Sequence, residues 1–262
     1  MGDYNTKKIV FVILSALITI QLVTCKATPL SEDLLEVNNN QDQEQAQFSE
    51  QQKRFKEKCV RAYGNEDAFS DMQEVRLYLS ECVSDIFYNA SVLGNELITA
   101  YENGSLKQVL MKYCDMKEDF VRCFSPFMKN LEKCMENEDE IKFVRVGMRF
   151  IKSVTGHVCY HNGQRTRDLI ENGGFQCIDE KTTDVLGCFH STKSLKTMFQ
   201  SVYDNAFVFE EQKCMDVINY EKCVIDKLKD CNSTSAIDFH NNLFKAIKRV
   251  LPCDFSKSSN LM

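Results

Sequence analysis

The chain has 262 residues, 44% of them hydrophobic, which is enough apolar material for one medium domain or two small ones. The formal net charge of −6 argues against sequence-independent nucleic-acid binding, because that needs a basic surface. Thirteen cysteines, none of them in a CxxC pair, fit an oxidising compartment better than a cytosolic metal protein.

The N-terminal segment has the composition of a signal peptide. A lysine pair precedes a mainly apolar run at 9–23, which is too short to span a bilayer comfortably. Cleavage is expected after Cys25 or Ala27, and either cut leaves twelve cysteines, an even number. We therefore predict a signal peptide over residues 1–27 and a secreted, extracellular protein without a later membrane span. An uncleaved anchor that keeps Cys25 is the alternative.

Two polar segments flank the remaining chain. Residues 28–58 form a leader dominated by Asn, Gln, Glu and Lys, which cannot bury enough apolar surface to offset its ordering entropy. We predict a mobile spacer there, helical only towards Cys59, with a partner-binding tail as the alternative. The C-terminal tail, 254–262, is short and carries neither a lipid-anchor signal nor a retention tetrapeptide.

Between these segments, apolar residues recur at spacings of three and four, which is typical of amphipathic helices. Ser70 with Gln73 resembles a capping box that begins the first helix. Gly173 and Gly174 are expected to end a short one, because glycine readily takes the left-handed C-cap conformation. No segment alternates with period two, so the predicted fold class is all-α. The expected helices cover about 70–86, 106–113, 120–134, 141–156, 165–172, 177–189, 194–207, 211–229 and 235–251.

The cysteines repeat one spacing. Cys114 and Cys123 are separated by eight residues, and so are Cys214 and Cys223. In both sets a Lys- and Phe-rich helical stretch leads to the last cysteine. The twelve cysteines expected to form disulfides are Cys59, Cys82, Cys114, Cys123, Cys134, Cys159, Cys177, Cys188, Cys214, Cys223, Cys231 and Cys253.

This repeated cysteine spacing predicts one helical domain cross-linked by disulfides, 59–253. The domain would consist of two six-cysteine halves, 59–159 and 177–253. The pairing is left open, because the sequence does not choose among the possible connectivities. Each bond is expected to add about 2–4 kcal/mol of stability, mainly by restricting the unfolded chain.

Three stretches of the domain carry a family resemblance: KYC at 112–114, VCYHNGQRTRDLIENGGFQC at 158–177 and FKAIKRVLPC at 244–253. With the order of the intervening cysteines, they resemble the insect 27 kDa hemolymph glycoprotein family over about Cys59 to Cys253. The resemblance implies a secreted, glycosylated, helical plasma protein and brings no catalytic residues with it. The polar leader departs from the family, which leaves hemolymph, saliva or venom open as the fluid.

Three Asn-x-Ser/Thr sequons are present, and a signal peptide gives them access to the glycosylation machinery. All three are expected near helix ends or loops, where a glycan fits. We predict that at least one is used. The acceptor residues are Asn89, Asn103 and Asn232.

No catalytic motif stands out. His157, Cys159 and His161, with His190 or His240, are the residue types of a zinc site, but oxidation in the secretory pathway favours a disulfide beside surface histidines. The CCxxHxxC signature of phospholipase A2 and a GxSxG elbow are both absent. We predict no catalytic residue, no cofactor and no metal, and a secreted hydrolase is the least favoured function.

Two side-chain patterns bear on binding. Phe120, Phe124, Phe127 and Leu131 make an aromatic stripe that is expected to be core, with an internal cavity for a small apolar ligand as the alternative. A basic face is expected to be solvated, with an anionic head group or glycan as the alternative ligand. That face consists of Lys142, Arg145, Arg149 and Lys152, and Lys245, Lys248 and Arg249 occupy a comparable place in the second half.

The sequence therefore predicts a non-enzymatic binding or plasma protein of insect body fluid whose extracellular partner is unknown. A carrier of a small apolar ligand and a salivary or venom effector are the alternatives. Nucleic acid is not an expected partner.

Overall fold

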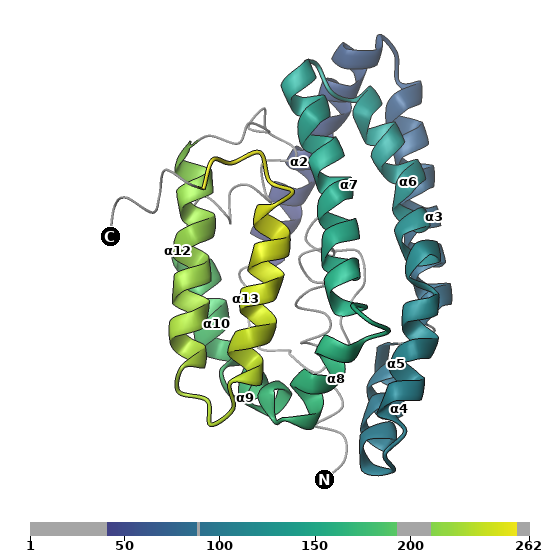
Figure 1. Ribbon diagram of the computed structural model, residues 1–262. Helices are drawn as coiled ribbons and strands as arrows, with labels where there is room; N and C mark the ends of the chain where they lie inside the picture. The colour runs from purple at the N-terminus through teal and green to yellow at the C-terminus, as the bar shows by residue number, and fades with distance from the viewer. Residues whose placement is uncertain (1–40, 88–89, 193–210, 256–262) are drawn as a thin grey trace.

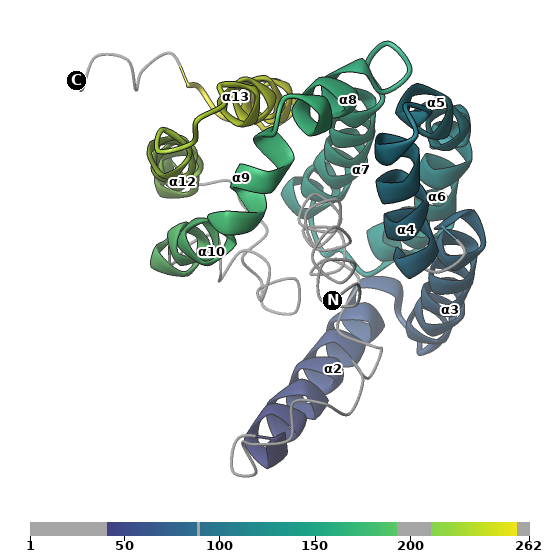
Figure 2. The ribbon, with the colours of Figure 1, turned by 90° about the horizontal axis from the view of Figure 1, so that it is seen from below.

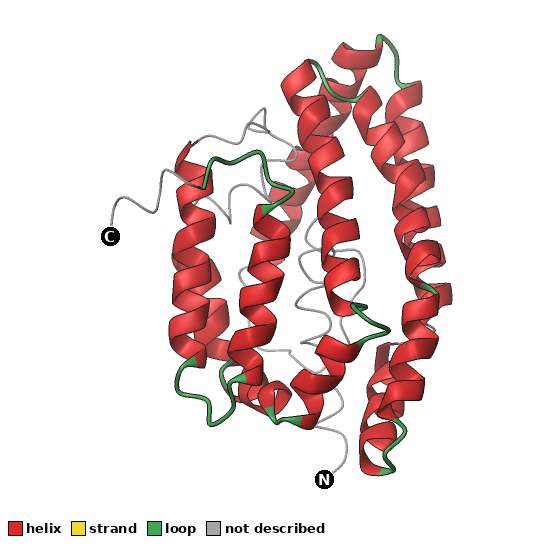
Figure 3. Ribbon diagram, viewed as in Figure 1, coloured by secondary structure: helices red, strands yellow, loops and turns green. Residues whose placement is uncertain are grey.

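The computed structural model describes residues 41–87, 90–192 and 211–255, and within these ranges it contains helices, turns and no strand (Figure 3). The predicted all-α class is therefore confirmed. The signal peptide, Asn89 and the helix expected at 194–207 lie outside the described residues. The helices are α2 (Gln41–Tyr63), α3 (Asp67–Phe87), α4 (Ala90–Glu102), α5 (Leu106–Asp115), α6 (Lys117–Lys133), α7 (Glu138–Val158), α8 (Gln164–Glu171), α9 (Gly174–Glu180), α10 (Thr182–Ser191), α12 (Glu211–Leu228) and α13 (Ser235–Lys248).

Several helix boundaries differ from the sequence prediction. The capping box at Ser70 is wrong, because α3 begins at Asp67, whose backbone N–H donates to the Asn65 side chain at 2.9 Å. Helix α4 was not predicted. The single helix expected over 177–189 is divided into α9 and α10 at Lys181. Gly173 does take the left-handed conformation, with φ at +71°, but Gly174 begins α9.

Helix α2 extends into the segment expected to be a spacer. It begins at Gln41, and its N-terminal part projects away from the other helices (Figure 2). Its C-terminal part packs onto the bundle, where Phe55 is 6% exposed and Cys59 is fully buried. The leader therefore supplies the last residues before Cys59 to the core, which a mobile spacer would not do.

The helices gather around two main cores (Figure 1). One core lies among α2, α3, α6 and α7, and the other joins α8, α9, α10, α12 and α13. A smaller cluster packs α4 and α5 against α8. Helices α7 and α13 lie side by side and antiparallel between the two main cores, where Ser153 Oγ donates to the Ala246 carbonyl at 2.9 Å.

Six disulfide bonds link the twelve cysteines, and each bond stays within one of the two predicted halves. In both halves the first cysteine pairs with the fifth, the second with the fourth and the third with the sixth. Whether the halves are autonomous units stays a prediction. The bonds are Cys59–Cys134, Cys82–Cys123 and Cys114–Cys159, followed by Cys177–Cys231, Cys188–Cys223 and Cys214–Cys253.

Candidate binding groove

A surface groove of about 560 Å³ lies between α6 and α7. We call it the basic groove, because five of its lining side chains are cations and a single one is an acid. It contains all four residues of the basic face that the sequence predicted on the fourth expected helix. The lining residues are Ser125, Met128, Lys129, Glu132, Lys142, Val144, Arg145, Met148, Arg149 and Lys152.

Helical periodicity places the cations of α7 in one row. The spacings from Lys142 to Lys152 are three, four and three residues, so the side chains project from one face. The start of α7 is fixed by Asn137, whose side chain accepts hydrogen bonds from the backbone N–H groups of Asp139 at 3.1 Å and Glu140 at 3.0 Å. The row is therefore set by a capped helix that packs along α6.

The charges of the groove are only partly neutralised. Lys142 pairs with Asp139 at 3.0 Å, and Arg145 lies 3.4 Å from Glu132. The other three cations, Lys129, Arg149 and Lys152, are exposed and have no acidic partner among the described residues. A concave surface with unpaired charge of one sign raises the local concentration of oppositely charged ligands.

The floor of the groove is apolar. Val144 is 2% exposed, Met128 is 6% exposed, and Met148 is half-buried beside them. Gly147 of α7 faces Met128, whose Cε would lie 3.5 Å from a Cβ at that position. Methionine side chains adapt easily to the shape of a ligand, so the groove offers a compliant apolar strip beneath a rim of cations.

In the comparable place of the second half, Lys248 is neutralised, while Lys245 and Arg249 are exposed. Residues 151–154 read IKSV and residues 247–250 read IKRV, which aligns Lys152 with Lys248. Lys248 donates to both carboxylate oxygens of Glu221, at 2.9 and 2.6 Å. Glu221 lies two residues before Cys223, and the residue two before Cys123 in the first half is Val121. The first half therefore lacks the acid that neutralises the lysine of the second.

The histidines of the less favoured zinc site form no metal-binding group among the described residues, and the expectation of surface histidines is wrong for His157. His157 is 2% exposed and packs against Phe239 of α13 with ring centroids 4.7 Å apart. Cys159 is bonded to Cys114, so it offers no thiolate to a metal. His161 is exposed and stacks on Tyr160. The side chain of His190 is outside the described part of the structure.

His157 is held as a neutral side chain. Burial, with the neighbouring positive charge of Arg165, lowers the pKa of His157 to about 4. Arg165 Nη1 lies 3.1 Å from His157 Nδ1 and donates to it, because a guanidinium has no acceptor. Burial also lowers the pKa of His240 on α13. These histidines therefore belong to the contact between α7 and α13.

Comparison with known proteins places the chain in a family. Residues 45–253 match the family described as "Protein of unknown function (DUF1397)". The chain belongs to this family. Three relatives are each 24% identical: a 27 kDa glycoprotein of Bombyx mori, a 27 kDa hemolymph protein of Galleria mellonella and a 27 kDa hemolymph glycoprotein of Manduca sexta. The alignments cover 72%, 73% and 74% of this chain and 81%, 79% and 81% of the relatives, in that order.

The resemblance to insect 27 kDa hemolymph glycoproteins is thereby confirmed. No solved structure matches this DUF1397 protein significantly. Six disulfides agree with the predicted extracellular class, since such bonds persist in oxidising fluids. Among the described residues, no helix combines the length and apolarity needed to cross a bilayer.

Two predicted acceptor sites of this DUF1397 protein lie on exposed turns. Asn103 is exposed in the turn between α4 and α5, and Asn232 is exposed between α12 and α13. At both positions a glycan has room. The aromatic stripe, in contrast, is core: Phe120, Phe124 and Phe127 are 4%, 1% and 6% exposed and pack among α2, α3, α6 and α7.

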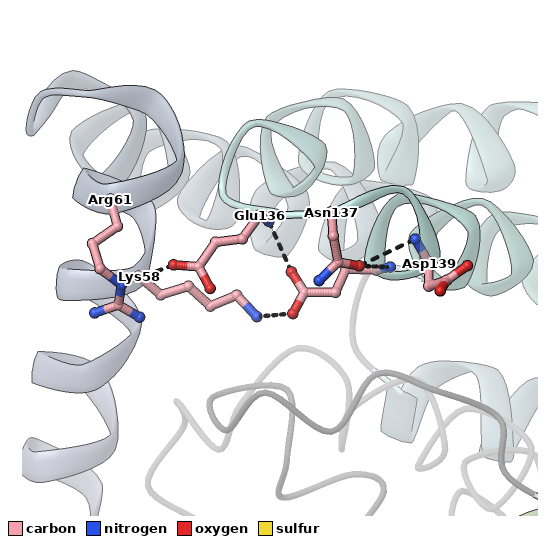
Figure 4. Close-up of polar contacts among 6 residues, drawn as sticks. Lys58, Arg61, Glu136, Asn137 and Asp139 are labelled. Atoms are coloured by element: carbon pink, nitrogen blue, oxygen red, sulfur yellow. Dashed lines mark hydrogen bonds and ion pairs between the residues drawn. The ribbon is translucent and has the colours of Figure 1, made fainter.

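The structure contains a buried ion pair that the sequence did not predict. Lys58 Nζ lies 2.7 Å from Glu140 Oε1, and the side chains are 1% and 3% exposed. The second oxygen of Glu140 accepts from the backbone N–H of Glu136, whose own carboxylate meets Arg61 (Figure 4). These contacts join the end of α2 to the start of α7. No local pattern reveals a pair whose members are 82 residues apart.

Proposed function

We propose that this protein is a secreted, N-glycosylated, non-enzymatic binding protein of insect hemolymph, and that the basic groove holds an anionic ligand. The relatives support the fluid and the glycosylation, because two of them are named as hemolymph proteins and two as glycoproteins. The exposure of Asn103 and Asn232 supports glycan attachment at those sites. The cysteines support the absence of thiol chemistry, since all twelve are spent on cross-links.

The observation that carries the binding role is the unpaired positive charge of the basic groove. Lys129, Arg149 and Lys152 line one groove with an apolar floor, in a protein whose net charge is −6. Several unpaired cations in one concave surface create a local positive potential, which attracts an anionic ligand although the net charge of the protein is negative. The aligned Lys248 is paired with Glu221, so the unpaired lysine is not a general property of the repeat.

The alternative of an internal cavity has less support. It placed the ligand beside the aromatic stripe, and that stripe is packed into the first core. The volume of the basic groove falls within the range typical of small-molecule sites, but the groove opens onto solvent.

A hydrolase also has less support, because His157 faces Phe239 and Arg165 rather than a nucleophile.

The proposal is tested with protein purified from its source fluid. Native mass spectrometry reports attached glycans, the number of disulfides and any co-purifying molecule, and glycosidase treatment should increase the gel mobility. Calorimetric titration of recombinant secreted protein with oleate, inositol hexakisphosphate and a heparin oligosaccharide then tests anion binding. At least one anion should bind the wild type and bind Arg149→Ala/Lys152→Ala more weakly. Unchanged binding of every anion by that variant refutes the groove as the site.

A further inference from the structure

The cations of the basic groove form a line rather than a point. Lys142 and Lys152 are ten residues apart on α7, which corresponds to about 15 Å along the helix axis. Lys129 adds a cation from the facing helix α6. A single carboxylate or phosphate meets one or two of these groups. Because Lys142 and Arg145 already pair with Asp139 and Glu132, a chain with several negative charges would meet the three unpaired cations together.

The shape of the groove narrows the class of anion. Its floor lies below the rim cations, with Val144 and Met128 almost fully buried, so a flat membrane surface does not reach it. A fatty acyl chain is poorly served, since the groove is open and apolar ligands are normally enclosed over most of their surface. Nucleic acid is disfavoured too, because no aromatic side chain lines the groove for base stacking.

A sulfated saccharide complements both the cations at the rim of the groove and the apolar residues at its floor. Its sulfate groups carry charges at regular intervals along a linear chain, and the C–H faces of its sugar rings are apolar. The sulfates would pair with Lys129, Arg149 and Lys152, and a ring face would pack on Met148. Charge-assisted contacts of this kind supply most of the affinity of basic sites for polyanions.

We propose that the basic groove binds a linear, multiply sulfated glycan chain. This inference rests on the proposed function and specifies its ligand. In this proposal the sulfate groups pair with Arg149 and Lys152 of α7 and with Lys129 of α6. The sugar rings pack on the methionine side chains of the floor. The second half contributes no such site at Lys248, because Glu221 already occupies that lysine.

The experiment measures the dissociation constant of a short heparin oligosaccharide for the full-length secreted protein. Arg149→Ala/Lys152→Ala should raise the constant about tenfold or more and flatten its salt dependence, because fewer counterions are displaced. The matched control, Lys222→Ala/Lys227→Ala, removes the same charge from exposed positions on α12 and should stay within about twofold. All four positions are exposed, and circular dichroism verifies that both variants fold.

The outcomes separate the two proposals. Loss of binding on desulfation of the oligosaccharide, with binding intact in the control, supports the glycan assignment. Equal weakening of both variants, or equal binding of a single-stranded DNA oligomer, overturns it. If oleate or inositol hexakisphosphate binds in a groove-dependent way and the sulfated chain does not, anion binding stands and the glycan inference fails. If no anion depends on the groove, both fail.

Discussion

Lys58 donates a hydrogen bond to Glu140 across 2.7 Å, although 82 residues separate them, and both side chains are withdrawn from solvent. The carboxylate of Glu140 also accepts the backbone N–H of Glu136 at 2.8 Å. The pair sits beside the Cys59–Cys134 bond. One covalent and one ionic link therefore fasten α2 to the segment that leads into α7.

Removal of one partner of this pair should be costly. Lys58→Met leaves the Glu140 carboxylate buried without its cation, and we expect a loss of about 3–5 kcal/mol in the free energy of unfolding. Urea denaturation followed by circular dichroism measures it. Arg61→Ala, which breaks the exposed contact with Glu136 at 2.8 Å, is the control and should cost about 0–1 kcal/mol.

The double variant Lys58→Met/Glu140→Leu separates the cost of an unpaired charge from the value of the pair. With both charges replaced by apolar groups, most of the lost stability should return. Equal destabilisation by Lys58→Met and Arg61→Ala would show that the buried pair carries no special weight.

His157 should make stability depend on pH. Its folded-state pKa of about 4 lies below the ordinary value of 6.5, so the unfolded chain takes up the proton first as the pH falls. The contribution of neutral His157 to the free energy of unfolding is complete above pH 6.5 and is lost as the pH falls towards 4. The total loss is about 3 kcal/mol. Urea denaturation at pH 7 and pH 5 measures the change.

His157→Gln is the matched variant, because glutamine keeps an acceptor for Arg165 and does not titrate. The other titrating groups are common to both proteins, including His240, whose pKa is also lowered by burial. The wild type should therefore lose more stability than the variant between pH 7 and pH 5. Parallel losses would remove His157 as the cause.

Chemical cleavage should separate the two halves. Hydroxylamine cuts Asn–Gly bonds, and two of them, Asn162–Gly163 and Asn172–Gly173, lie between the last cysteine of the first half and Cys177. Since none of the six disulfides among the described cysteines crosses this span, denaturing electrophoresis without thiol should resolve two fragments. The third such bond, Asn103–Gly104, lies inside the loop closed by Cys82 and Cys123, so its cleavage should release nothing before reduction.

Fragments that stay joined until thiol is added would contradict this pairing. Resistance of Asn103–Gly104 to the reagent in the secreted protein, with cleavage in protein made without N-glycosylation, would at the same time locate a glycan on Asn103.

Two glycines should respond in opposite directions to alanine. A Cβ at Gly174 would lie 2.7 Å from the Ala236 nitrogen and 2.8 Å from Leu169 Cδ1, so Gly174→Ala should destabilise the protein by about 1–3 kcal/mol or more. Gly187 is exposed within α10 and has nothing within 4 Å, so Gly187→Ala should stabilise by about 0.5–1 kcal/mol. Thermal melts compare them, and similar melting temperatures would show that α9 can shift away from α13.

The fold class and most helices were predictable because apolar spacing is a local property. The start of α3 was not, since Asn65 supplies the capping oxygen and Ser70 merely continues the helix. The break between α9 and α10 at Lys181 was not predicted, because the spacing of apolar residues continues through it. The packing of the end of α2 was not predicted, because the segment is mostly polar. A few apolar residues, such as Phe55, are enough to anchor the helix.

The sequence predicted one of the two sides of the candidate site. The row on α7 follows from helical periodicity, so its four cations were found. The contribution of α6 depends on how the two helices pack, which places Lys129 and Met128 opposite that row. The neutralisation of Lys248 by Glu221 depends on the packing of α12 against α13 in the same way.

Disulfide bonds confined to each half also bear on biosynthesis. The six cysteines of the first half, Cys59 to Cys159, emerge from the ribosome before Cys177, and all their partners are among themselves. Oxidative folding can therefore finish on the leading portion while the trailing portion is still being translated. The search then involves about 15 arrangements for six thiols at a time, against roughly ten thousand for twelve together, which lowers the demand on disulfide isomerases in the secreting cell.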